Sequence, residues 1–230
     1  MHKMTCIGTL AVFVCAALAS GCASKTVQKD EYSGYLGNGY SQLKEAKDPK
    51  GDLVLRYISP DLNPGKYSAL MLDPLVYHPV PKPTEQVSAE TLREIGQYLN
   101  RTLRSKFAEK VRVVDQPGPG VARLSIAFTA VRGQDESLSA YQYIPVAFVI
   151  TMGARAVEGQ AQQAKLLCES LVVDSVSGER LAMQVRSGTG ESLKNVAGKG
   201  RVLTLEAVKP LIDLWIDATA EGLNRYIKAK

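Results

Sequence analysis

The sequence has little histidine and little cysteine, which limits the chemistry that it can support. It contains two histidines and four cysteines, and only His78 and Cys168 lie beyond residue 22. A single histidine excludes a two-histidine metal site and most histidine-based triads. The residues that follow His78 are prolines and a valine, which offer it no serine or cysteine partner. Cys168 lies in the apolar stretch LLCESLVV, where a small buried side chain is the default role and a reactive thiol is the alternative.

The sequence also lacks a phosphate-binding loop and a cluster of charges of one sign. Its 28 basic and 23 acidic residues are interleaved along the chain. The basic stripe that is typical of nucleic-acid binding is therefore missing, and we predict no nucleic-acid partner. The glycine clusters at 118–120, 188–190 and 198–200 match neither the P-loop nor the dinucleotide fingerprint, so we predict turns at all three.

Three carboxylates, Asp73, Glu169 and Asp174, lie near predicted strands. A glycosidase-like pair depends on a separation across the fold that the sequence does not define. Strand edges and turn caps explain these side chains more simply. We therefore predict that the chain is not an enzyme and holds no cofactor or metal, with a hydrolase that uses these carboxylates as the weakest alternative.

Long hydrophobic runs are also scarce, and the longest lies at the N-terminus. It follows Lys3 and extends from Cys6 to Ala19, a run of 14 residues, whereas a spanning helix needs about 20. Its length and basic start predict a secretory signal over residues 1–22 rather than a transmembrane anchor. The run ends in Ala19-Ser20-Gly21-Cys22, which resembles a lipobox. Because only a cysteine thiol accepts the diacylglyceryl group, we predict that Cys22 is the lipidated N-terminus; the alternative is an ordinary signal with a chance cysteine.

The residues after Cys22 predict where the lipidated chain is sorted. Ala23 and Ser24 follow it, so the second mature position lacks the aspartate that retains Gram-negative lipoproteins in the inner membrane. We therefore predict an outer-membrane anchor with the domain in the periplasm. Two or three acyl chains hold a protein firmly at a membrane, so no other membrane contact is needed. With Cys22 acylated, Cys168 is the only free thiol and an internal disulfide is excluded.

The domain organisation follows from a change in composition near residue 60. Residues 23–60 are polar and broken by glycine, proline and tyrosine, which predicts a tether and N-terminal extension. Within it, Leu53, Leu55 and Tyr57 alternate as in an edge strand. Residues 61–230 are long enough and apolar enough for a single globular domain with a sizeable core.

Two amphipathic helices are predicted inside this domain. The first covers Ala89–Lys110, with Ser88 as its N-cap. The second lies in the C-terminal stretch that begins at residue 203, and Pro210 is tolerable only near its start or at a kink. Each has apolar residues at three- and four-residue spacing on one face. For the first helix these are Leu92, Ile95, Leu99, Leu103 and Phe107, and for the second Val208, Ile212, Trp215, Thr219, Leu223 and Tyr226.

Alternation of apolar and polar residues predicts the strands. Residues 67–77 form a buried strand in which Pro74 marks a bulge or an end. Residues 121–133 form a half-exposed strand with Ala122, Leu124, Ile126, Phe128 and Ala130 on its apolar face and Arg123, Ser125 and Thr129 opposite. Residues 166–186 form a hairpin that turns at Gly178, with Leu181, Met183 and Val185 facing the core. The fold class is therefore α+β: a two-layer sandwich with a mostly antiparallel or mixed sheet and two main helices packed on one face.

The segment from Tyr141 to Gly159 is ambiguous. Its alternating apolar residues are typical of a strand with one fully apolar face. That strand could face lipid or another subunit, as in membrane hairpins that assemble into a barrel. A buried strand or short helix that caps the core is the simpler interpretation, because a channel subunit needs a hairpin and only one such segment is present.

Three stretches carry a resemblance to a known family. They are YSGYLGNGYSQLKE after the lipidation site, LRYISPDLNPGKYSALMLDPLVY, and ESLVVDSVSGERLA ahead of a C-terminal helix that contains Trp215. The mature chain resembles a family of uncharacterised proteobacterial lipoproteins, domain of unknown function number thirty-three thirteen. The resemblance implies a cell-envelope lipoprotein and supplies no catalytic residue.

These observations predict a non-enzymatic outer-membrane lipoprotein. Its domain would bind a protein or another envelope partner through exposed sheet edges or the tyrosine-rich N-terminal segment. The alternative is a subunit or accessory of an oligomeric envelope channel or transport complex, and the sequence does not define the oligomeric state.

Overall fold

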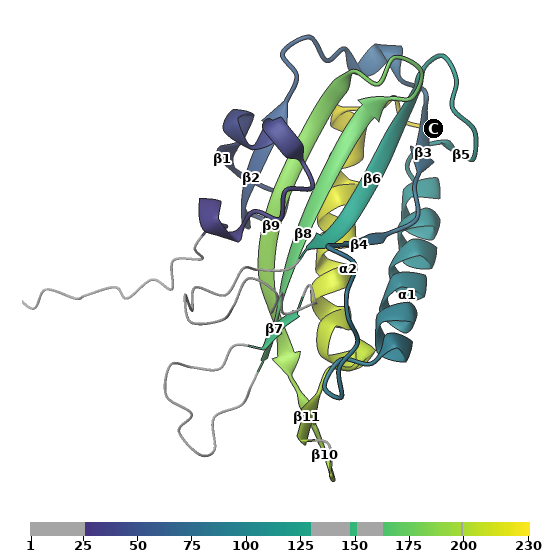
Figure 1. The fold of residues 1–230 in the computed structure, drawn as a ribbon. Helices are drawn as coiled ribbons and strands as arrows, with labels where there is room; N and C mark the ends of the chain where they lie inside the picture. Colours follow the sequence, from purple (N-terminus) through teal and green to yellow (C-terminus); the bar gives the residue numbers. More distant parts are fainter. Residues whose placement is uncertain (1–25, 130–147, 151–162, 199) are drawn as a thin grey trace, which may run out of the picture.

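The computed structural model describes residues 26–129, 148–150, 163–198 and 200–230 of the chain. In these ranges the chain folds around one nine-stranded sheet, in the order β1-β2-β9-β8-β6-β3-β5, with β4 beside β6 and β7 beside β8 (Figure 1). The strands are β1 Lys44–Lys47, β2 Leu53–Ile58, β3 Ala69–Leu72, β4 Val76–His78, β5 Val113–Val114, β6 Val121–Thr129, β7 Phe148–Ile150, β8 Gln163–Asp174 and β9 Arg180–Ser192. A separate two-stranded ribbon pairs β10, Lys194–Val196, with β11, Gly200–Val202.

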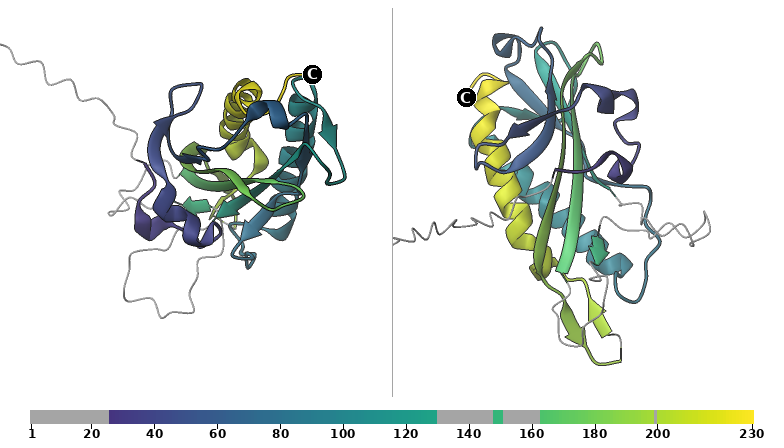
Figure 2. Two further views of the ribbon diagram at one scale, coloured as in Figure 1. Left: turned by 90° about the horizontal axis from the view of Figure 1, so that it is seen from above. Right: turned by 90° about the vertical axis from the view of Figure 1, so that its left-hand side faces the viewer.

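The predicted α+β fold class is confirmed. The sheet is mixed, because β3 runs parallel to β5 and β6 and β4 runs parallel to β6, while β1, β2, β9, β8, β7 and β6 pair antiparallel. The two main helices, α1 Ala89–Ala108 and α2 Leu205–Gly222, lie on the same face of the sheet (Figure 2). Each buries its apolar stripe against the strands.

Both helices begin at a side-chain cap. The Ser88 hydroxyl accepts a hydrogen bond from the Thr91 amide, and the Thr204 hydroxyl accepts one from the Ala207 amide, which satisfies amides that lack a partner in the first turn. All five predicted core residues of α1 are buried. In α2, Pro210 lies in the second turn, and Val208, Ile212 and Trp215 are buried on the predicted face.

The predicted strand at residues 67–77 is divided at Pro74. β3 and β4 lie before and after this proline and both pair with β6. Leu72 lies opposite Leu124, and Val76 lies opposite Ala127. The chain thus advances four residues from Leu72 to Val76 while β6 advances three from Leu124 to Ala127. The extra residue is a bulge at Pro74, which has no amide hydrogen to donate to the ladder.

The predicted hairpin is confirmed, but its side chains are divided between two cores. The ladder of β8 and β9 has a register shift between Val172 and Val173. Ahead of this irregularity Leu181 joins the core under the helices. Met183 and Val185 lie on the opposite face, in a second cluster with Val27 and Leu36. The prediction that all three face one core was wrong, because a bulge changes the face to which the following residues point.

This second cluster corrects the expected tether over residues 23–60. From residue 26 to residue 42 the segment lies on the sheet face opposite the helices (Figure 2), and the rest of it joins the edge of the sheet. It contains two short 3-10 helices, Lys29–Glu31 and Gly37–Gln42, and then β1 and β2. Val27 is 4% exposed. The apolar and aromatic side chains of this N-terminal segment cover the sheet, so the segment belongs to the domain. Leu53–Ile58 is a strand as predicted, although β1 pairs with its outer edge.

The same segment covers part of the face of β6 that was expected to be half exposed. Arg123 is exposed there and Ser125 is half-buried, whereas Thr129 is fully buried. The prediction of an open face was therefore wrong at the end of the strand that lies nearer to β7.

The glycines at 188–190 were predicted to form a turn but lie inside β9. A Cβ atom on Gly188 would lie 2.7 Å from Leu211 Cδ1 and 2.9 Å from Trp215 Cζ2. A Cβ atom on Gly190 would lie 2.4 Å from the Ala207 carbonyl oxygen. Glycine is used here for close approach between α2 and the strand rather than for a turn. At 118–120 a turn is present, with positive φ at Gly120, and another includes Gly198, which also has positive φ.

Several predicted features lie outside the described residues. They are the signal at residues 1–22, the lipidation site Cys22, the sorting positions Ala23 and Ser24, and all of Tyr141–Gly159 except β7. Within the described ranges, no helix has the length and apolar character needed to cross a bilayer.

Candidate functional site

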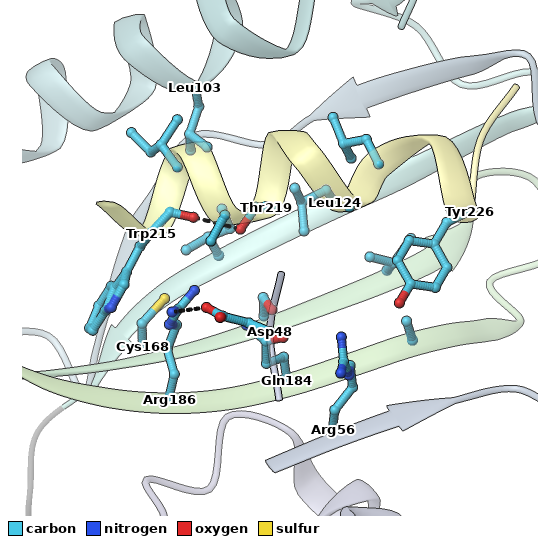
Figure 3. A pocket seen from close by; sticks show the side chains of 18 of the residues that line it. Asp48, Arg56, Leu103, Leu124, Cys168, Gln184, Arg186, Trp215, Thr219 and Tyr226 are labelled. Carbon is cyan, nitrogen blue, oxygen red and sulfur yellow. Dashed lines mark hydrogen bonds and ion pairs between the residues drawn. The ribbon is translucent and has the colours of Figure 1, made fainter. Parts of the chain in front are cut away.

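A cavity of about 150 Å³ lies between the sheet and α2 (Figure 3). Its walls come from the helix-facing side of β6, β8 and β9, from α2 and from one side of α1. The apolar lining includes Leu99, Leu103, Leu124, Phe128, Ile212 and Trp215.

The cavity leaves side chains of the central strands incompletely buried. Ile126, Cys168, Ser170 and Val172 lie in the middle of the sheet beneath the helices, yet all four are only half-buried. Side chains in this position are normally packed to the density of an organic crystal. Their incomplete burial means that α2 does not fill the space above them.

A buried ion pair forms the most deeply buried polar part of the cavity wall, which also includes Arg56, Ser170, Gln184, Thr219 and Arg225. Arg186 Nη2 donates to Asp48 Oδ2 at 2.7 Å, and the two side chains are 5% and 3% exposed. The Arg186 guanidinium also lies over the Trp215 ring, with its carbon 4.7 Å from the ring centroid. In Figure 3 the two charged side chains and Trp215 meet beside Cys168. Charges are buried at this depth only when they are paired and hydrogen-bonded.

Asp48 is held in place by the turn between β1 and β2. Its second oxygen, Oδ1, accepts hydrogen bonds from the amides of Lys50 at 2.9 Å and Asp52 at 3.0 Å. The same turn contacts the C-terminal end of α2, because Lys50 forms an ion pair with Glu221. The turn therefore closes one side of the cavity and delivers a carboxylate to Arg186.

Cys168 lies directly opposite Arg186 in the ladder of β8 and β9. Burial raises the pKa of its thiol to about 12, and the charge of Arg186 offsets only part of that effect. The thiol is therefore protonated at neutral pH and is a poor nucleophile. This agrees with the predicted structural role of Cys168.

The three carboxylates singled out in the sequence lie in separate environments. Asp73 accepts hydrogen bonds from Arg123 Nε at 2.9 Å and from the Ser125 hydroxyl at 2.5 Å. Asp174 caps the β8–β9 turn: amides of the turn and the Tyr67 hydroxyl hold the pKa of its carboxyl well below the usual range. These two are structural, as the simpler interpretation predicted.

Glu169 has a different role, which the sequence did not predict. It is fully buried on the sheet face away from the helices. Its carboxylate accepts hydrogen bonds from the Ser33 amide at 3.1 Å and the Tyr40 hydroxyl at 2.6 Å. The Tyr40 ring in turn stacks on Tyr32, with centroids 4.3 Å apart. Glu169 thus holds the N-terminal segment on the sheet.

His78 lies at the end of β4, and its ring centroid is 5.7 Å from that of Tyr35. In the part of the chain that the structure describes, no three histidine, cysteine or acidic side chains are grouped to hold a metal ion. The site residues Asp48 and Arg186 were both missed in the sequence. The sequence carried no signal for either residue: Arg186 alternates with Met183 and Val185 and shares its face with Gln184, so the pattern predicts that both polar side chains face solvent.

Comparison with known proteins places this fold in a family. The family model described as "Protein of unknown function (DUF3313)" matches residues 31–219. The chain is 34% identical over 214 residues to the uncharacterized lipoprotein YdcL of Escherichia coli strain K12, covering 92% of this chain and 95% of that one. These matches define a lipoprotein family of unknown function. The chain belongs to DUF3313, as the sequence resemblance indicated.

The similarity to solved structures is weak. A PelC dodecamer from Paraburkholderia phytofirmans has a TM-score of 0.35 and 14% identity, covering 76% of this chain and 97% of that chain. The hypothetical protein CT253 from Chlamydia trachomatis has a TM-score of 0.40 and 9% identity, covering 68% and 97%.

The family motifs coincide with contacts in this structure. YSGYLGNGY provides Tyr32, Ser33 and Tyr40, and the motif ESLVVDSVSGERLA begins with Glu169. The first stretch therefore folds onto the second.

Proposed function

We propose that this chain is a non-enzymatic binding module of the cell envelope, anchored in the outer membrane through acylated Cys22, with its domain in the periplasm. The binding site in this proposal is the cavity between the sheet and α2, and its ligand is a small, largely apolar molecule. The observation that carries the proposal is an unfilled, mainly apolar space over the central strands, with one buried ion pair in its wall.

The cavity supports binding better than it supports catalysis. An apolar recess with few, fixed polar groups is the usual form of a small-molecule site. The thiol in its wall is protonated at neutral pH, and its acid, Asp48, is engaged by Arg186 and two backbone amides. None of these groups is free to exchange a proton or attack a substrate.

The site also replaces the surface first expected to bind a partner. The tyrosine-rich segment was expected to be available, but Tyr40 is bonded to Glu169 and stacked on Tyr32. The apolar residues of this segment pack in the second core cluster of the domain. A ligand therefore has a better-defined place in the cavity than on this segment.

The test is to identify the small molecules that co-purify with the protein. Wild-type lipoprotein and a Ser170→Leu variant, in which the added side chain occupies the cavity, would be purified in parallel from envelopes and extracted with organic solvent. We expect mass spectrometry to find small apolar molecules enriched in the wild-type extract. Equal extracts from the two proteins would contradict the proposal, and a ring-sized oligomer in detergent would favour the channel or transport subunit instead.

A further inference from the structure

Arg186 has a hydrogen-bonding capacity that its contacts in the fold do not use. Its side chain is 5% exposed, and one terminal nitrogen, Nη2, donates to Asp48. Its Nε–H is buried and has no hydrogen-bond partner among the residues that the structure describes. A buried donor without an acceptor costs the folded state about 1–3 kcal/mol, and more when the group is charged.

This donor belongs to a side chain that lines the cavity. Arg186 lines it together with Trp215 and Cys168 (Figure 3), although the Nε atom itself has almost no exposed surface. The indole ring covers the face of the guanidinium, and Cys168 lies across the ladder from it. A thiol is only a weak acceptor, so neither neighbour satisfies Nε. An acceptor that enters the cavity beside Arg186 and displaces the covering side chains would do so.

The charge balance decides what kind of acceptor this is. Asp48 already neutralises Arg186 at 2.7 Å. Arg56 and Arg225 also line the cavity, but Arg225 is exposed and Arg56 lies beside Tyr226, apart from Arg186 (Figure 3). A carboxylate or phosphate bound to Arg186 would therefore place a second negative charge next to Asp48 in a region of low dielectric constant, where an uncompensated charge is costly. A carbonyl, ester or ether oxygen accepts the same hydrogen bond without adding charge.

The volume limits the apolar part of the ligand. The cavity measures about 150 Å³. A cavity of about that size lined by Leu, Ile and Phe holds one benzene ring. Drug-sized ligands need roughly 300 Å³ or more. A two-chain lipid is therefore too large, and one ring or a short alkyl chain fits.

We propose that the cavity binds a small neutral molecule, formed by one aromatic ring or a short alkyl chain that carries a carbonyl-type oxygen, and that Arg186 Nε–H donates to this oxygen. The proposal rests on the proposed function, in which the cavity is the binding site, and adds the ligand class and the residue that selects it. Arg186 is a binding residue here, with Asp48 as the group that balances its charge.

The test compares three ring-sized probes that differ at one position. Acetophenone has a neutral carbonyl, ethylbenzene has no acceptor, and benzoate has a negative charge. The protein would be the chain with Cys22→Ser behind a cleavable secretion signal, since the described core lies between Val27 and Ile227. Trp215 is the only tryptophan, so its indole N–H gives one NMR cross-peak that reports on the cavity.

We expect acetophenone to bind about 10-fold or more tightly than ethylbenzene, since one hydrogen bond to a charged group is worth about 1.4 kcal/mol or more. Benzoate is expected to bind more weakly than acetophenone at pH 7. Arg186→Lys keeps the positive charge but removes the Nε donor, so the preference for acetophenone over ethylbenzene should fall to about threefold or less. Arg180→Lys, on the same strand but outside the cavity, should keep it.

Different failures have different meanings. If wild-type protein binds acetophenone and ethylbenzene equally, the role of Arg186 is wrong, while the cavity is still a binding site. If benzoate binds best, the ligand is an anion and the charge argument is overturned. If all three probes leave the Trp215 cross-peak unmoved in wild-type and in Ser170→Leu alike, the proposed function fails together with this inference.

Discussion

At the scale of single residues, Cys168 and Arg186 define the cavity because each faces it from a neighbouring strand. The two residues lie opposite each other in the ladder. Their chemistry differs: the thiol is held neutral by burial, whereas the guanidinium is paired with the Asp48 carboxylate. A neutral surface with one fixed donor is suited to selecting a neutral polar group on an apolar ligand.

Cys168 gives a prediction for pH dependence. Its pKa rises from 9.0 to about 12 on folding, so the folded state favours the protonated thiol. Its contribution to the free energy of unfolding should be complete below pH 9.0 and should be lost as the pH rises towards 12. Urea titrations of wild type and Cys168→Ala should therefore give a stability difference that changes over this range.

Alkylation checks the same prediction directly. At pH 8, iodoacetamide should label the native protein far more slowly than the protein unfolded in urea, because the folded thiol is protonated. Rapid labelling of the native protein would show that Cys168 is not shielded.

At the scale of secondary-structure elements, β9 is shaped by the two layers on either side of it. Its glycines allow α2 to approach closely, while Met183 and Val185 contact the N-terminal segment on the other face. β9 therefore has glycines where α2 crosses it and large side chains where the N-terminal segment covers it.

Gly190→Ala tests the close approach of α2. The added methyl group would lie 2.4 Å from a backbone oxygen of Ala207, which only a shift of the helix relieves. We expect a loss of about 1–3 kcal/mol in the free energy of unfolding. Gly118→Ala is the matched control, since its nearest neighbour would be Val121 Cγ2 at 3.9 Å; equal losses for both variants would contradict the packing argument.

Tyr40→Phe tests the attachment of the N-terminal segment. It removes the 2.6 Å hydrogen bond to a carboxylate that is fully buried. A loss of about 1–3 kcal/mol in unfolding free energy is expected, because a buried charged acceptor is left with one donor fewer.

A double-mutant cycle with Glu169→Gln isolates the hydrogen bond between Tyr40 and Glu169. If Glu169 is the partner that matters, Tyr40→Phe should cost much less in a Glu169→Gln background than in wild type. An unchanged cost in that background would assign the effect of Tyr40→Phe to its stacking on Tyr32.

At the scale of the whole molecule, the predicted anchor is close in sequence to the folded domain. Val27 is already 4% exposed within that domain, and four residues lie between it and Cys22, so five peptide units join the two. A fully extended chain covers about 3.3–3.6 Å per residue, so at most about 18 Å separate the two. With Cys22 acylated, the domain would therefore be held next to the bilayer rather than at the end of a long spacer.

Sorting can be tested with one substitution beside Cys22. Ala23→Asp introduces the inner-membrane retention mark at the second mature position. We expect the variant to move from the outer-membrane to the inner-membrane fraction on a density gradient, while Cys22→Ser prevents acylation and gives no lipid-labelled protein. Ser24→Thr, which keeps Ala23 at the second mature position and adds no acid, should fractionate like wild type; if Ala23→Asp does so too, the predicted outer-membrane sorting is wrong.

The sequence by itself determined the type of each main element. Ser88 and the three- and four-residue spacing of Leu92 to Phe107 define α1, and the alternation in 166–186 defines the β8–β9 hairpin. These features are local, because a helix cap and a periodic pattern act through residues close in sequence. The family resemblance also rested on motifs of residues that are close in sequence.

Only the tertiary structure decided which surfaces these elements cover. The bulge at Val172 and Val173 separates Leu181 from Met183, and Glu169 binds Tyr40 from 129 positions away. Arg186 and Asp48 meet across 138 positions. The physical reason is that side-chain burial depends on contacts between distant parts of the chain, which periodicity does not encode. For this reason a segment with the composition of a tether became part of the core, and an arginine at the end of a predicted hairpin became the buried charge of the cavity.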